Sequence, residues 1–127
     1  MVKKEIPAEV RRFVLTRIPS VPHIEALMLL RASAPDSWSA ATLAPRLYVR
    51  KPVAAAVLDD LHQAGMLHQA EDGGYVFMRE PGLLADVIEA LAILYSTHLV
   101  EITMLIHSKM DRKAQQFADA FDFRKEM

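Results

Sequence analysis

The chain has 127 residues, of which 52% are hydrophobic and 24% are charged, a composition typical of one globular domain and unlike that of a disordered chain. It contains no cysteine, which excludes disulfides, thiolate zinc sites and cysteine nucleophiles. Fifteen basic and sixteen acidic residues give a formal net charge of −1, whereas a protein that binds nucleic acid through a broad basic face usually carries a clear positive excess. Any nucleic-acid contact therefore has to come from a local basic patch.

The first half of the chain predicts four helices. The first begins at Pro7 and ends at Pro19 and Pro22, since proline cannot continue a helix. The second covers about residues 23–34, and the third covers residues 40–47. The fourth follows a short basic stretch and runs from Pro52 through Ala64.

Local signals mark the ends of the third and fourth helices. Ser39 is a good N-cap for the third, and Pro52 suits the first turn of the fourth, which Gly65 ends as a C-cap. Residues 66–70 and 75–79 then flank Glu-Asp-Gly-Gly, which is typical of a β-hairpin.

The last part of the chain predicts one long helix over about residues 83–108 and a polar helix or tail over residues 111–127. The whole chain, 1–127, is then a single domain. The apolar stretch 83–106 is long enough to consider as a membrane span, but it contains Asp86, Glu89 and Glu101, and each acid costs about 2.5 kcal/mol or more at the bilayer centre. We therefore expect a buried helix. With no apolar leader at the N-terminus and no cysteine, we expect a cytoplasmic protein.

Residues 38–47 read Trp-Ser-Ala-Ala-Thr-Leu-Ala-Pro-Arg-Leu, and residues 57–67 read Val-Leu-Asp-Asp-Leu-His-Gln-Ala-Gly-Met-Leu. With three helices followed by a hairpin, this order resembles the winged helix-turn-helix superfamily of small bacterial transcription regulators, of the MarR-like or PadR-like kind. The resemblance covers about residues 23–80. The most specific part of the resemblance is the glycine that follows Leu-x-x-x, because glycine supplies a left-handed helix cap just before a strand.

The resemblance implies a mainly α fold with a small β-hairpin, a winged helix-turn-helix plus a long C-terminal dimerisation helix. In the family, the second helix of the motif enters the major groove. Aligned on Leu61 and Gly65, its outward positions fall here on apolar or acidic residues, which departs from the family pattern because alanine and valine cannot hydrogen-bond to bases. The candidate DNA-binding residues are Arg46, Arg50, Lys51, Val53, Ala55, Ala56 and Arg79.

Charge does not decide between two explanations of this apolar helix. Residues 40–79 hold four basic and four acidic side chains, a balance of zero. Either the helix is covered by another part of the chain or by a protein partner, or it docks weakly on DNA, with affinity supplied by phosphate contacts from two copies.

Apolar residues in the long helix recur at alternating steps of four and three, the spacing of coiled-coil-like pairing. This seam predicts a homodimer through Leu84, Ile88, Leu91, Tyr95, His98, Ile102 and Leu105. Beyond it, Phe117 and Phe121 would share one face of a helix and latch onto the core or onto the second copy.

No His-Glu-x-x-His, phosphate-binding glycine loop, dinucleotide fingerprint or Gly-x-Ser-x-Gly elbow occurs, so we expect neither an enzyme, nor a cofactor, nor a metal site. His98 and Glu101 are one turn apart, but two ligands are too few for a metal without a third from another helix. The leading hypothesis is a small dimeric winged-helix regulator that binds double-stranded DNA. The alternative is a winged-helix module that binds a protein partner and has no sequence-specific DNA readout; neither needs a membrane.

Overall fold

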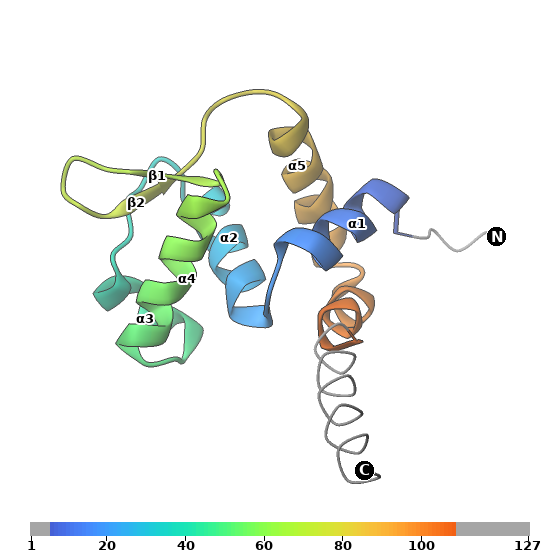
Figure 1. Ribbon diagram of the computed structural model, residues 1–127, viewed down its shortest axis with the longest axis horizontal. Coiled ribbons are helices and arrows are strands. Elements are labelled where there is room, and N and C mark those ends of the chain that lie inside the picture. The colour runs from blue at the N-terminus through green and yellow to red at the C-terminus, as the bar shows by residue number, and fades with distance from the viewer. Residues whose placement is uncertain (1–5, 109–127) are drawn as a thin grey trace, which may run out of the picture.

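The computed structural model describes residues 6–108, which form helices and one two-stranded antiparallel hairpin (Figure 1). This confirms a mainly α fold with a small β element. In chain order the elements are α1 (Ala8–Arg17), α2 (Val21–Ala32), α3 (Ala40–Leu47), α4 (Lys51–Gln63), β1 (Leu67–Gln69), β2 (Tyr75–Phe77), α5 (Leu83–Tyr95) and a further helix, Leu99–Ser108. The tail over residues 111–127, with Phe117 and Phe121, lies outside the described residues. Among residues 6–108, no single helix is both long and apolar enough to cross a membrane.

Capping residues explain where the first helices begin. Pro22 does not end α1, as the sequence suggested; it lies in the first turn of α2, where a missing N–H costs nothing. Ser39 forms the expected cap of α3. Its hydroxyl accepts from the backbone N–H of Thr42 (3.2 Å), and the Thr42 hydroxyl accepts from the backbone N–H of Ser39 (2.9 Å).

Two glycines shape the end of α4 and the hairpin turn. Gly65 has φ +81° after α4, and Gly73 has φ +86° in the turn, a backbone region that favours glycine. The strands pair Leu67 with Phe77 and Gln69 with Tyr75. The predicted hairpin is therefore confirmed, with shorter strands than expected.

A third extended segment joins the hairpin through Trp38. Its backbone N–H and C=O pair with the C=O and N–H of Tyr75, both at 2.8 Å. The segment just before α3 is thereby attached to β2, so that α3, α4 and the hairpin are held as one unit.

The expected single helix over residues 83–108 is wrong. The chain breaks at Ser96–His98, and α5 meets the helix Leu99–Ser108 at a bend of 117°. The straight seven-residue seam is therefore lost. Moreover Ile88, Leu91 and Ile102 have no exposed surface in the protomer, so they are core residues rather than a free dimer surface.

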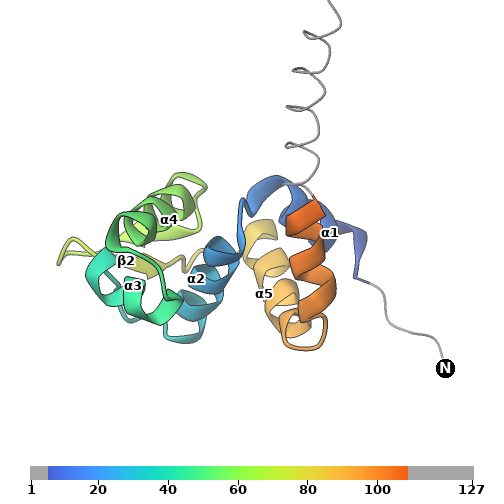
Figure 2. The same ribbon diagram turned by 90° about the horizontal axis from the view of Figure 1, so that it is seen from below.

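The helices form two groups on either side of α2 (Figure 2). The α3, α4 and hairpin unit lies on one side, and α1, α5 and the helix Leu99–Ser108 lie on the other, around one continuous apolar core. Two polar contacts connect α2 to α5. Arg31 donates three hydrogen bonds to Glu89 (2.6, 2.7 and 3.0 Å), and the Tyr95 hydroxyl donates to Glu25 (2.9 Å). Burial and the Glu25 carboxylate both raise the pKa of Tyr95, so this hydroxyl keeps its proton.

Candidate nucleic-acid interface

The candidate interface is built on α3, α4 and the turn between them. The inner face of α4 carries Ala54, Val57, Leu58 and Leu61, all buried in the core, and α3 contributes buried Leu43 and Ala44. This packing fixes one face of α4 and leaves the opposite face to solvent. The helix is about 20 Å long, which is enough to follow one face of a DNA groove.

Tyr48 ends α3 in a left-handed conformation, with φ 57° and ψ 42°. This geometry lets the backbone N–H of Val49 donate to the carbonyl of Ala44 (3.1 Å), as in the usual helix C-cap. A non-glycine residue there costs on the order of 1 kcal/mol. The Tyr48 side chain is 94% exposed, so the chain presents a large aromatic ring to solvent immediately before α4.

The outward face of α4 offers little for base readout. Pro52, Ala56, Asp59 and Gln63 recur at steps of four, three and four, opposite the buried residues, and all four are exposed. The expected outward residues Val53, Ala55 and Ala56 are exposed too, Val53 at 42%. Among these residues only Gln63 has a side chain that can donate a hydrogen bond, and Gln63 is the last residue of α4.

Three of the four predicted basic contacts come from the last turn of α3 and the start of α4. Arg50 is the N-cap of α4 and Lys51 is its first residue, and both are exposed. Arg46 is exposed on the last turn of α3, and its guanidinium lies over the Trp38 ring, 5.5 Å from the ring centroid. This cation–π contact draws the Arg46 charge back toward the start of α3 and the hairpin.

Arg79 does not join this cluster. The backbone N–H of Met78 donates to the carbonyl of Met66 (3.0 Å), which places Arg79 beside the residues that follow α4. It is separated from Lys51 by about the length of α4, roughly 20 Å. The basic groups therefore mark the two ends of α4 rather than one patch, with Asp59 and Asp60 on the helix between them.

The hairpin is acidic where a wing would approach DNA. Its turn carries exposed Glu71 and Asp72. The Ser37 hydroxyl (2.6 Å) and the backbone N–H of Gly74 (2.8 Å) both donate to Asp72 and hold the pKa of its carboxyl below the usual range. Asp72 is therefore ionised at neutral pH, and this tip repels phosphate.

A polar chain connects α4 to α2 behind the interface. The Ser20 hydroxyl and the Asp60 carboxylate contact the two ring nitrogens of His23, at 2.6 Å to Nδ1 and 2.8 Å to Nε2. His23 is only 8% exposed, so these contacts satisfy a nearly buried ring. Asp60 is thus a structural partner of His23 and not simply a surface charge.

Sequence reasoning missed three features of this site. Tyr48 was not singled out because a left-handed position is usually signalled by glycine or asparagine. The pairing of Trp38 with Tyr75 joins residues 37 apart, and the contact of His23 with Asp60 is equally long-range. The Trp38 spacing from the hairpin gave no local signal for the pairing.

Other kinds of site have less support within the described range. No three His, Asp or Glu side chains in residues 6–108 gather as metal ligands. His98 contacts the hydroxyl of its neighbour Thr97 (2.8 Å) at the break after α5. Comparisons of the chain with protein-family models, with curated proteins and with solved structures found no match.

Proposed function

We propose that this chain is a small winged-helix transcription regulator that binds duplex DNA through the α3–α4 turn and the N-terminal half of α4. The observation that carries the proposal is that Arg50 and Lys51 are exposed at the start of α4, and Arg46 on the last turn of α3, while the inner face of α4 is packed in the core. A helix of this size fits the major groove, and cations at its start can contact the phosphates on either side.

The chemistry of α4 favours affinity over sequence discrimination. Phosphate contacts supply affinity that does not depend on sequence. Val53 and Ala56 can touch thymine methyl groups, whereas the outward side chains between Lys51 and Gln63 offer no hydrogen-bond donor to a base. Tyr48 adds a flat, amphipathic group at the turn, where it can pack on a sugar or reach a phosphate with its hydroxyl.

A homodimer would compensate for the small number of phosphate contacts that one protomer can make. Three cations in one protomer give few phosphate contacts, and a homodimer doubles them on one duplex. The dimer expected from the sequence therefore belongs to the proposal, although its surface has to differ from the seam first expected, because that seam is bent and partly buried.

A second candidate function is a protein-binding module. The observation favouring it is the exposed apolar face of α4 beside Asp59, Asp60 and the ionised Asp72, since these acids oppose DNA and suit a protein surface. In this case Tyr48 would be the anchor of a protein interface, where tyrosine is enriched.

Charge reversal separates the two functions. We would measure fluorescence anisotropy of a labelled mixed-sequence duplex with the Arg50→Glu/Lys51→Glu variant at about 50 mM salt. The matched control is Arg11→Glu/Arg12→Glu, which reverses two exposed charges on α1. The proposal expects at least about a tenfold loss of affinity in the first variant and a much smaller loss in the control. Equal losses in both variants would refute this site, and no binding by the wild-type chain would favour the protein-binding module.

A further inference from the structure

The polar chain behind α4 contains the three groups of a serine hydrolase, namely a hydroxyl, an imidazole and a carboxylate. The Ser20 hydroxyl lies 2.6 Å from Nδ1 of His23, and Nε2 of the same ring lies 2.8 Å from the Asp60 carboxylate. A hydroxyl within hydrogen-bond reach of a base, whose other nitrogen is held by a third group, is the arrangement that activates a serine. Such a set is recognised by its geometry, and because His23 and Asp60 are 37 residues apart, a search for local motifs does not reveal it.

The two contacts of the His23 ring decide which of its nitrogens carries the proton. A carboxylate only accepts hydrogen bonds, so the Nε2–H of His23 donates to Asp60. When the ring is neutral, Nδ1 then has a lone pair that accepts from the Ser20 hydroxyl. Because His23 is only 8% exposed, little water competes for this nitrogen. His23 is therefore placed to take the Ser20 proton, and Asp60 orients the ring.

The position of Ser20 provides a donor for the negative charge that develops on an attacked carbonyl. Ser20 immediately precedes α2 and is half-buried, and its side chain caps no backbone N–H of that helix. Within residues 6–108, the backbone N–H of Val21 donates no hydrogen bond. In enzymes with a nucleophile elbow, the N–H of the residue after the serine is one of the oxyanion donors. Val21 offers the same group here.

A small pocket next to Ser20 fits the acyl part of a small ester. It measures about 320 Å³ and lies between the start of α2 and the end of α3, which is near the lower end of the range for ligand pockets. It adjoins the serine because Val21 is one of its walls. Most of its side chains are apolar or aromatic, and one charge of each sign favours neither an acid nor an amine. The pocket is lined by Val21, Pro22, Glu25, Arg46, Leu47 and Tyr48.

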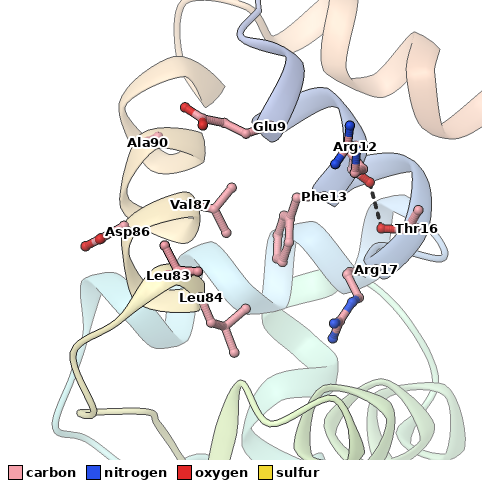
Figure 3. A pocket seen from close by; sticks show the side chains of 10 residues that line it. All are labelled: Glu9, Arg12, Phe13, Thr16, Arg17, Leu83, Leu84, Asp86, Val87 and Ala90. Carbon is pink, nitrogen blue, oxygen red and sulfur yellow. Dashed lines mark hydrogen bonds between the residues drawn. The ribbon is translucent and has the colours of Figure 1, made fainter.

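The larger groove between α1 and α5 does not offer this chemistry (Figure 3). Its hydroxyl belongs to Thr16, which donates to the carbonyl of Arg12 in the same helix (2.7 Å), as the dashed line in Figure 3 marks. No histidine is among the described residues that line this groove, so Thr16 has no base beside it. The larger cavity therefore lacks the pair that Ser20 and His23 form.

We propose that this chain hydrolyses small uncharged carboxylic esters, with Ser20 as the nucleophile and His23 as the general base. The Ser20 Oγ forms a bond to the ester carbonyl carbon while its proton passes to Nδ1 of His23. The bond from that carbon to the alcohol oxygen then breaks, and the alcohol leaves with the proton from Nδ1.

Water completes the reaction. A water molecule adds to the acyl carbon and gives a proton to Nδ1 of His23. The bond between the acyl carbon and the Ser20 Oγ then breaks, Ser20 recovers the proton from Nδ1, and the carboxylic acid is released. Asp60 is a positioning residue, because it contacts the ring and not the ester.

Hydrolysis of p-nitrophenyl acetate by the full chain tests the activity. We expect Ser20→Ala to lose at least about tenfold of the wild-type rate, since it removes the nucleophile and leaves the base. The matched control is Thr97→Ala. The Thr97 hydroxyl also contacts a histidine, at 2.8 Å from Nδ1 of His98, but it donates to the carbonyl of Leu94, and its removal should keep the wild-type rate. A wild-type rate no higher than that of buffer, or equal rates for wild type and Ser20→Ala, would overturn the proposal.

Covalent labelling locates the nucleophile without turnover. An alkyl fluorophosphonate forms a bond to an activated serine oxygen and releases fluoride, and peptide mass spectrometry should find the group on Ser20. His23→Gln should abolish this labelling. His68→Gln, which removes the exposed contact of His68 with Glu80, should leave it unchanged. Circular dichroism checks that each variant is folded. An absence of label on Ser20 in the wild-type chain, or labelling that survives in folded His23→Gln, contradicts the mechanism.

The role of Asp60 has its own readout. Asp60→Asn should lower kcat by at least about tenfold with KM nearly unchanged, because the ring loses its orientation and the pocket is intact. Asp60→Glu, which keeps the carboxylate, should recover part of kcat. An unchanged kcat in Asp60→Asn would refute the triad. All these assays are run without DNA, so their failure leaves the DNA-binding proposal standing.

Discussion

Removing the Asp60 carboxylate should destabilise the protein, whereas removing its neighbour Asp59 should not. Both residues are exposed acids on α4, but only Asp60 contacts His23, at 2.8 Å from Nε2. The Asp60→Ala variant leaves this nitrogen of a ring that is 8% exposed without its acceptor. The penalty for an unsatisfied buried polar group is about 1–3 kcal/mol. Because the Asp60 side chain itself is half exposed, we expect the lower part of this range, about 1–2 kcal/mol.

Urea denaturation followed by circular dichroism at neutral pH measures the difference. We expect a lower midpoint for Asp60→Ala with an unchanged slope, which means a loss of stability without a change in the surface exposed on unfolding. The Asp59→Ala variant should stay within about 0.5 kcal/mol of wild type. Equal effects of the two substitutions would refute the role given to the contact between α2 and α4.

Three further predictions concern the turn and the hairpin. Tyr48→Gly should keep stability within about 1 kcal/mol, because glycine suits the left-handed backbone, while DNA affinity measured by anisotropy falls. Gly65→Ala should cost about 1–2 kcal/mol in the same urea assay, since its φ of +81° disfavours a Cβ although no atom lies within 4 Å of it. Ser37→Ala should raise the pKa of Asp72 toward its ordinary value in an NMR titration, because the largest cause of the lowered pKa is lost; an unchanged pKa would contradict that assignment.

The elements that were predictable are those with local signals. The cap at Ser39 and the turn glycines act within a few residues of the backbone they shape, so α3, the end of α4 and the hairpin follow from short segments. The outward position of Val53 and Ala56 followed from the alignment with the winged-helix family on Leu61 and Gly65, and both residues are exposed.

The error at the last helix has a physical cause. Apolar residues continue at helical spacing through Ser96–His98, and periodicity cannot reveal that the chain turns there. The turn becomes favourable only because Ile102 and Ile106 are buried after the bend, together with Ile88 and Leu91 of α5. A straight helix would leave part of this apolar surface in water.

The candidate site was predictable in its residues but not in its arrangement. The basic side chains were visible in the sequence, yet the separation of Arg79 from Lys51 depends on how the hairpin returns along α4. Likewise, the cation–π contact of Arg46 with Trp38 and the hydrogen bond between His23 and Asp60 each join residues from different segments of the chain. Long-range contacts of this kind leave no periodic trace in the sequence.

The salt dependence of DNA binding by the wild-type chain tests the central claim most directly. Anisotropy on one mixed-sequence duplex would be recorded between about 50 and 200 mM salt. If Arg46, Arg50 and Lys51 each contact a phosphate, the slope of log affinity against log salt is about −2.7 for one protomer and about −5.4 for two. A slope in this range supports a DNA-binding regulator. The absence of binding at about 50 mM salt, or an affinity that does not change with salt, would contradict it.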